Sequence, residues 1–168
     1  MSGPTLTGFI WFLQNIVGIP TLYLPPDAPV IGWCYDLSVN EVNQIFMCVP
    51  IWAPAGQQQI YTQMVYNLAA HDVVLLAPDV QPPPTPPYAV SPTGQPIGYF
   101  ESMREKFGLN TLVPGVVTAT FDQGSGTTLV VAESLKNLTI EDLGLLQTPW
   151  GRAYLGQAQK WNRPWGIS

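Results

Sequence analysis

The sequence predicts a mainly α protein: a helical bundle with an inserted extended β-hairpin, and a C-terminal helix plus extended tail. Apolar residues recur at helical spacing along most of the chain, and the period changes from 3.6 to 2 within residues 115–133, where two runs are rich in β-branched residues. The length of 168 residues suits one hydrophobic core, so we expect a single domain over residues 1–168.

The charge of the chain is low and unevenly distributed. Charged residues make up 10% of the sequence, against about a quarter in an average protein, and the net charge is −5. Residues 143–168 carry three basic residues and no acid, whereas residues 1–142 carry all 11 acids and the other three bases. An acidic chain is not expected to bind nucleic acid as its main partner. Its weakly charged surface is either packed against other chains or simply polar.

The first helix is predicted over residues 6–17, with Thr5 or Thr7 as its N-cap and Gly18 at its end. Polar residues interrupt this apolar run and no basic residue precedes it, so it predicts neither a signal peptide nor a membrane span. We therefore expect a protein that is made in the cytoplasm and has no membrane partner.

A second helix is predicted after Asp27, a candidate N-cap, with Pro29 in the first turn, where its missing N–H costs nothing. Apolar residues keep the helical spacing from there to about residue 49. Ser38 begins a capping-box pattern, so the segment is either one long helix or two short helices with a break near this residue. Pro50 ends the segment in either case.

The clearest helical pattern covers residues 57–76 and predicts a central core helix. Its expected apolar face consists of Ile60, Met64, Leu68, His71 and Leu75. A histidine on such a face is expected to be a hydrogen-bonded core residue. The alternative is that His71 acts as a general base paired with Asp72. This pairing is disfavoured, because neighbouring residues in a helix point about 100° apart and do not face each other.

Two irregular features follow the central helix. Residues 78–96 contain eight prolines in nineteen positions, which predicts a stiff proline-rich loop, or alternatively a ligand for SH3-like domains. After a short helix over residues 97–107, two runs rich in β-branched residues predict the strands of the hairpin at 115–133. A lone hairpin is marginal in water, so it is expected to lie on the helices or on a neighbouring chain. The predicted tip consists of Asp122, Gln123, Gly124, Ser125 and Gly126.

The last helix is predicted over residues 148–161, because Thr148-Pro149 is an N-cap followed by proline at the first helical position. Four residues of this helix share one stripe: Trp150, Tyr154, Ala158 and Trp161. Core packing of the helix is the simplest explanation of Trp150 and Trp161. A second Pro-Trp-Gly at 164–166 lies beyond the helix, so residues 162–168 are expected to form an extended tail. Tryptophan, tyrosine and arginine dominate the hot spots of protein–protein interfaces, and Trp165 in such a tail indicates an external binding partner.

The sequence contains no pattern that predicts catalysis, a cofactor or a metal site. His71 is the only histidine, and the acids are scattered. Cys34 and Cys48 lack metal-type spacing and are expected to be reduced core residues. We therefore expect a protein that is not an enzyme and that needs no cofactor or metal.

Four stretches of the chain form a recognisable series: FLQNIVGI in the first helix, PPDAPVIGWC at the start of the second, MVYNLAAHDVVLLA in the central helix, and TPWGRAYLGQAQKW near the C-terminus. In this order they resemble the head-to-tail adaptor (connector) proteins of tailed bacteriophages. The last is similar to the family's T-x-[YW]-G-x-x-[YF]-L motif. The resemblance spans most of the chain.

The resemblance implies a structural protein of the virion neck, at the head–tail junction. About a dozen copies would form a ring beneath the portal protein, joining the capsid to the tail or head-closure protein below. The ring would line the channel through which genomic DNA passes without sequence-specific binding. The hairpin tip would contact a neighbouring copy or the next ring. The portal-binding residues that the resemblance implies are Trp150, Arg152, Tyr154, Trp161, Arg163 and Trp165.

Other functions remain open on the residues alone. A head-closure or tail-terminator protein of the same neck region is the nearest alternative, and such proteins are more usually β-rich barrels. A small helical enzyme or ligand-binding domain that uses His71 is a second alternative.

Overall fold

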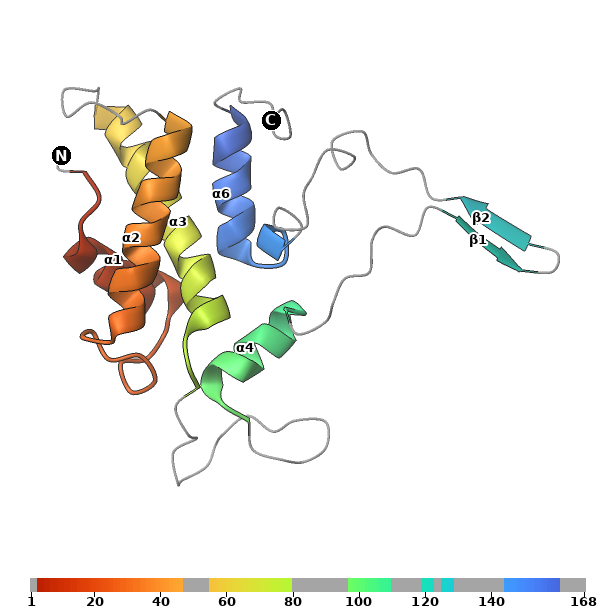
Figure 1. Ribbon diagram of the computed structural model, residues 1–168, viewed down its shortest axis with the longest axis horizontal. Coiled ribbons are helices and arrows are strands. Elements are labelled where there is room, and N and C mark those ends of the chain that lie inside the picture. Colours follow the sequence, from red (N-terminus) through yellow and green to blue (C-terminus); the bar gives the residue numbers. More distant parts are fainter. Residues whose placement is uncertain are drawn as a thin grey trace.

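The computed structural model describes six segments of the chain: residues 3–46, 55–79, 97–109, 119–122, 125–128 and 144–160. These residues are mainly helical, as predicted. The helical elements are α1 (Leu6–Phe12), the π-helix η1 (Leu13–Val17), α2 (Pro29–Phe46), α3 (Ala55–Leu76), α4 (Tyr99–Phe107) and α6 (Pro149–Lys160). Figure 1 shows α2 and α6 on either side of α3, with α4 across the lower end of α3. Within the described segments, no helix is long and apolar enough to cross a membrane.

The N-terminal helix begins at a threonine that also binds the central helix. The side chain of Thr5, one of the two predicted caps, accepts a hydrogen bond from the backbone N–H of Gly8 at 3.1 Å. The hydroxyl of Tyr66 in α3 donates to the carbonyl of Thr5 at 3.0 Å and accepts from its N–H at 3.1 Å. The cap of α1 is therefore fixed to the middle of α3.

The same segment ends differently from an ordinary helix. Its last five residues, Leu13–Val17, form a π-helix, and Gly18 ends it with φ at 80°, which glycine adopts without strain. The amide of Asn15 donates to the carbonyl of Trp11 at 2.9 Å, so a side chain occupies the acceptor that an α-helix would pair with the backbone of Asn15.

The second helix is one continuous element, which decides between the two predicted arrangements. Ser38 lies in its middle, fully buried, and its hydroxyl donates to Asp72 of α3 at 3.2 Å. The predicted N-cap at Asp27 is wrong by one residue. The helix begins at Pro29, and Ala28 precedes it, because the residue before a proline is biased away from helical geometry and suits the cap position.

Helix α3 contributes to both hydrophobic clusters and is the centre of the core, as predicted. One cluster joins α3 to α1, α2 and α4, and the other joins it to α2 and α6. Met64, Leu68 and His71 of the predicted face are buried. Leu75 is not: it is 38% exposed, because the end of α3 packs through Val73, Val74 and Ala77, and Leu75 lies on the opposite side of the helix.

Two short strands are described between α4 and α6. Strands β1 (Ala119–Asp122) and β2 (Ser125–Thr128) pair antiparallel, with Ala119 opposite Thr128 and Asp122 opposite Ser125. The predicted five-residue tip is therefore corrected: Asp122, Ser125 and Gly126 belong to the strands, and only two residues separate them. A two-residue connection containing glycine is a favoured way to join antiparallel strands.

Other predicted features lie largely outside the described residues. They are the rest of the hairpin at 115–133, almost all of the proline-rich loop at 78–96, and the tail at 162–168. An extended hairpin and a docking tail remain predictions.

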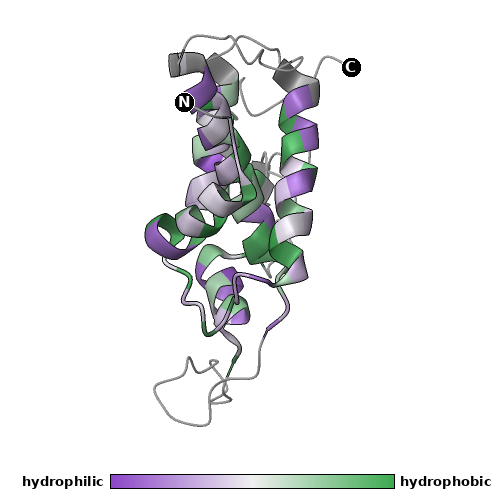
Figure 2. Cartoon of the chain, turned by 90° about the vertical axis from the view of Figure 1, so that its left-hand side faces the viewer, coloured by the Kyte–Doolittle hydropathy of each residue, from purple (hydrophilic) through white to green (hydrophobic). Residues whose placement is uncertain are grey.

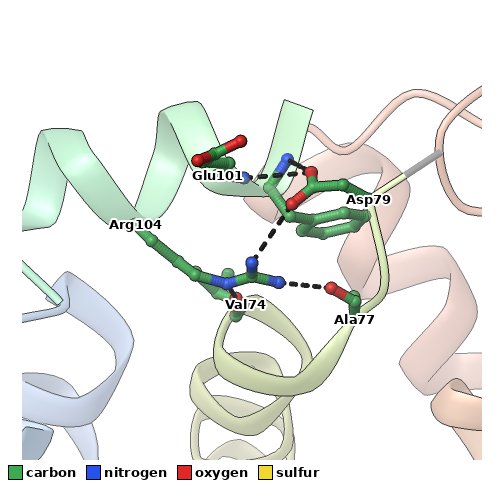
Figure 3. A network of polar contacts seen from close by, with 6 residues as sticks. Val74, Ala77, Asp79, Glu101 and Arg104 are labelled. Carbon is green, nitrogen blue, oxygen red and sulfur yellow. Dashed lines mark hydrogen bonds and ion pairs between the residues drawn. The ribbon is translucent and has the colours of Figure 1, made fainter. Parts of the chain in front are cut away.

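One polar network holds α4 at the end of α3 (Figure 3). Asp79 accepts hydrogen bonds from the backbone N–H groups of Phe100 and Glu101 at 2.7 and 3.0 Å, and so caps the start of α4. Arg104 donates to the carbonyls of Val74 and Ala77 and forms an ion pair with Asp79 at 3.1 Å. A single guanidinium thus satisfies carbonyls at the end of α3 that have no partner within that helix.

We expect Arg104→Ala to lower the free energy of unfolding by about 2 kcal/mol, because partly buried carbonyls and a carboxylate lose a charged donor. Arg104→Lys should recover less than half of this loss, since an ammonium cannot reproduce the geometry of the guanidinium. Urea denaturation of both variants tests this, with the exposed Lys106→Ala on the same helix as the control. Equal stability of Arg104→Ala and the control would contradict it.

Candidate functional site

The C-terminal helix starts at the residue that the sequence predicts. The hydroxyl of Thr148 accepts a hydrogen bond from the N–H of Gly151 at 3.0 Å, and its carbonyl accepts from the N–H of Arg152 at 3.1 Å. Pro149 takes the first helical position, and α6 continues to Lys160. Figure 2 shows hydrophobic and hydrophilic residues alternating along α6, as expected of a helix buried on one face.

A buried hydrogen bond joins this cap to the central helix. Nδ1 of His71 lies 2.8 Å from Oγ1 of Thr148, and the two side chains are 4% and 0% exposed. Burial lowers the pKa of His71 from 6.5 to about 4, so the imidazole is neutral at pH 7. The predicted role of His71 as a hydrogen-bonded core residue is confirmed.

The neighbouring acid faces another helix. Asp72 accepts a hydrogen bond from Ser38 of α2, whereas His71 bonds to α6. Burial raises the pKa of Asp72 from 3.8 to about 7; the bond from Ser38 opposes this shift, and the charge of Glu41 adds to it. Because the two side chains have partners on different helices, the structure does not bring them together as an acid–base pair.

The glycine of the C-terminal motif allows a close approach of backbone to backbone. A Cβ atom added at Gly151 would collide with the carbonyl of Leu145. Glycine at this position therefore lets the segment before α6 fold back against the first turn of the helix. Tyr154 and Leu155, the last two residues of the motif, are buried against α2 and α3 in the second hydrophobic cluster.

The residues expected to bind a portal do not form one surface. Tyr154 is fully buried, so in this structure it is a packing residue that a partner cannot contact. Trp150 is half-buried, with its ring edge-to-face against Phe107 of α4 at 5.7 Å. Arg152 is exposed and donates to the carbonyl of Leu146 at 3.2 Å. The remaining three, Trp161, Arg163 and Trp165, lie outside the described residues.

The structure also shows exposed aromatic residues that we did not predict. Trp11 in α1 and Trp33 in α2 are each 58% exposed. The helical spacing of α2 already contains the signal for the second, because Trp33 and Leu37 share one face and the buried Cys34 lies on the other. In α1, Phe9 and Leu13 are buried on one face of the helix, and Trp11, two residues from each, lies on the opposite face.

The described residues hold no group of three or more histidine, cysteine or acidic side chains that could bind a metal ion. Burial raises the pKa of the Cys34 thiol to about 12, with a smaller contribution from Asp72, so this cysteine is a protonated core residue. Comparisons of the chain with models of protein families, with curated proteins and with solved structures found no match.

We expect Thr148→Val to lower the free energy of unfolding by about 3 kcal/mol, because it removes the N-cap and leaves the buried His71 without its partner. Thr148→Ser keeps both hydrogen bonds and should lose less than about 1 kcal/mol. Urea denaturation at pH 7 distinguishes the variants, and a serine variant as unstable as the valine variant would contradict the assigned role.

The opposite pKa shifts of His71 and Asp72 predict a flat pH profile for this pair. Between about pH 4 and 6.5 the unfolded chain carries a proton on His71, and the folded chain carries one on Asp72 instead. The two proton counts are equal, so the pair gives almost no pH dependence to the free energy of unfolding.

Replacement of either residue should reveal the pH dependence of the free energy of unfolding that the other residue causes. In His71→Gln, stability should fall as the pH rises from about 4 to 7, because burial of Asp72 favours its protonated form. In Asp72→Asn, stability should fall as the pH drops from 6.5 to about 4, because the folded state disfavours a charged His71. Each slope is at most about 1.4 kcal/mol per pH unit. Slopes of the same sign in the two variants, measured by urea denaturation across this range, would refute the assignment.

Proposed function

We propose that the chain is a structural protein of a tailed-phage virion, a head-to-tail adaptor that forms a ring under the portal protein. The ring joins the capsid to the tail and lines the DNA channel. One observation carries the proposal. The two stretches that most resemble the adaptor family, MVYNLAAHDVVLLA and TPWGRAYLGQAQKW, meet in space at the buried bond between His71 and Thr148. Residues 77 positions apart thus form one structural unit.

The helical character of the described residues supports an adaptor over the nearest alternative. Head-closure and tail-terminator proteins are more usually β-rich barrels, whereas α2, α3 and α6 here share one hydrophobic cluster. A barrel buries its core between strands, and this cluster is buried between helices.

The firm attachment of α6 to the core also supports a docking role for the segment that follows this helix. The cap at Thr148, the close approach at Gly151 and the buried Tyr154 fix the helix to the core. Residues 161–168 therefore continue from a rigid support, and this segment carries Arg163 and two tryptophans but no acid. Repetition of a modest tail contact around a ring would multiply its strength through avidity.

A chain that ends at Asn162 should fold normally but lose most of its binding to the portal protein. The full chain and the truncated chain would each be used to capture proteins from infected cells, with the retained proteins identified by mass spectrometry. Far-UV circular dichroism and urea denaturation show whether the bundle is intact. Portal captured equally by both chains moves the docking surface to the bundle, and absence of any capsid or tail protein overturns the proposed function.

A matched pair of single substitutions sharpens the test. Trp165→Ala should weaken portal capture, whereas Trp11→Ala removes an equally large side chain that is exposed on α1 and should leave capture unchanged. Equal losses in the two variants would indicate a general effect of surface tryptophans rather than docking by the tail.

A further inference from the structure

The outer face of α2 carries large apolar side chains that nothing in the described part of the chain covers. Trp33 is 58% exposed and Leu37 is 43% exposed, and one helical turn separates them. Acidic and amide side chains lie on the same face. This surface, called the α2 stripe below, consists of Trp33, Asp36, Leu37, Asn40 and Glu41, all exposed. It lies opposite the residues through which α2 packs into the core, Ile31, Cys34, Ser38 and Val42.

The charge of the α2 stripe is of one sign. Residues 1–103 contain six acids and no lysine or arginine, so α2 and its sequence neighbours present no cation. Burial of an exposed tryptophan beside carboxylates favours a partner that brings positive charge, no acidic side chain and open space for the indole.

The outer face of α6 has these properties. Its exposed residues Arg152, Ala153 and Gly156 share one side of the helix, and α6 contains no acid. A Cβ atom added at Gly156 would meet nothing within 4 Å, so the space above this residue is open. A tryptophan and a leucine from a partner could lie against Ala153 and Gly156 while Arg152 pairs with a carboxylate.

The two faces of one chain cannot meet each other. Both α2 and α6 pack their buried sides into one cluster with α3, and the α2 stripe and the outer face of α6 both point away from that cluster. Figure 1 shows the two helices on either side of α3. Any contact between these faces therefore joins two copies of the chain.

We propose that the α2 stripe of one copy binds the outer face of α6 in the next copy, with Asp36 paired with Arg152 and Trp33 packed over Ala153 and Gly156. Such a head-to-tail contact uses two different surfaces, and its repetition closes into a ring or continues as a filament. The inference rests on the proposed ring. It assigns Arg152 to the neighbouring copy and leaves the portal to residues 161–168.

Exchange of the paired charges tests the contact directly. Asp36→Arg and Arg152→Asp, each made in the full-length chain, should weaken self-association about tenfold, because each places like charges together. The double variant should restore most of the association. Asp27→Arg makes the same charge change at an exposed loop residue and serves as the control. Dissociation constants come from sedimentation equilibrium.

The tryptophan of the stripe provides a second measurement. Trp33→Ala should weaken self-association about thirtyfold, as expected for a central interface tryptophan, and Trp11→Ala should leave it unchanged. Circular dichroism should show that all variants fold, since each altered side chain is exposed.

Three results would overturn the inference. The wild-type chain could stay monomeric at the highest concentration reached, or the double variant could self-associate no more tightly than the single charge variants. The third is an equal loss of self-association in Trp33→Ala and Trp11→Ala. Capture of the portal protein shows whether such a result contradicts only the proposed contact between copies or also the proposed adaptor function. If the charge variants capture portal through an intact tail but associate like the wild type, the adaptor proposal stands and the α2 stripe is not its ring contact. Binding of the α2 stripe to portal instead of to a second copy would have the same consequence.

Discussion

The architecture depends on the burial of one helix on several sides. The middle of α3 is apolar around most of its circumference, from Met64 to Val74, and such a helix is stable in water only when neighbours cover it. The surrounding helices each supply part of that cover. Their positions follow from the surface that α3 presents, because each turns its own buried residues toward it. Loss of any one of them would expose side chains that have no other partner.

Polar groups then decide how each neighbour is placed on α3. Apolar contacts are not directional, but each polar contact joins one particular pair of groups. His71 bonds to Thr148 at the start of α6, and Asp72 bonds to Ser38 of α2. The carbonyl of Val74, near the end of α3, bonds to Arg104 of α4. A slide of α6 by one turn would separate His71 from Thr148 and leave the buried imidazole nitrogen without its partner, at a cost of about 1–3 kcal/mol, although Thr148 would keep its bond from Gly151. The polar contacts thus specify an arrangement that apolar burial alone would leave loosely defined.

The sequence predicted the elements of the bundle better than its surface. Helical spacing located the central helix, and the Thr-Pro pair located the start of α6 to the residue, because both signals are local. Continuity of α2 through Ser38 was left open, since it depends on a partner 34 residues away. The exposure of Leu75, the burial of Tyr154 and the two-residue connection of the strands likewise depend on which neighbours cover each position, and spacing along one helix does not contain that information.

The burial of Tyr154 also separates two roles within the C-terminal motif. Thr148, Gly151 and Tyr154 act inside the chain, as cap, close contact and core residue, and they would be needed in any protein that seats this helix on α3. Recognition of a partner must come from residues that point outward, such as Arg152, or that follow the helix. A resemblance carried by the inward residues therefore supports a shared fold more strongly than a shared partner. The choice of partner depends on exposed residues of α2, α6 and the tail, where few packing constraints act.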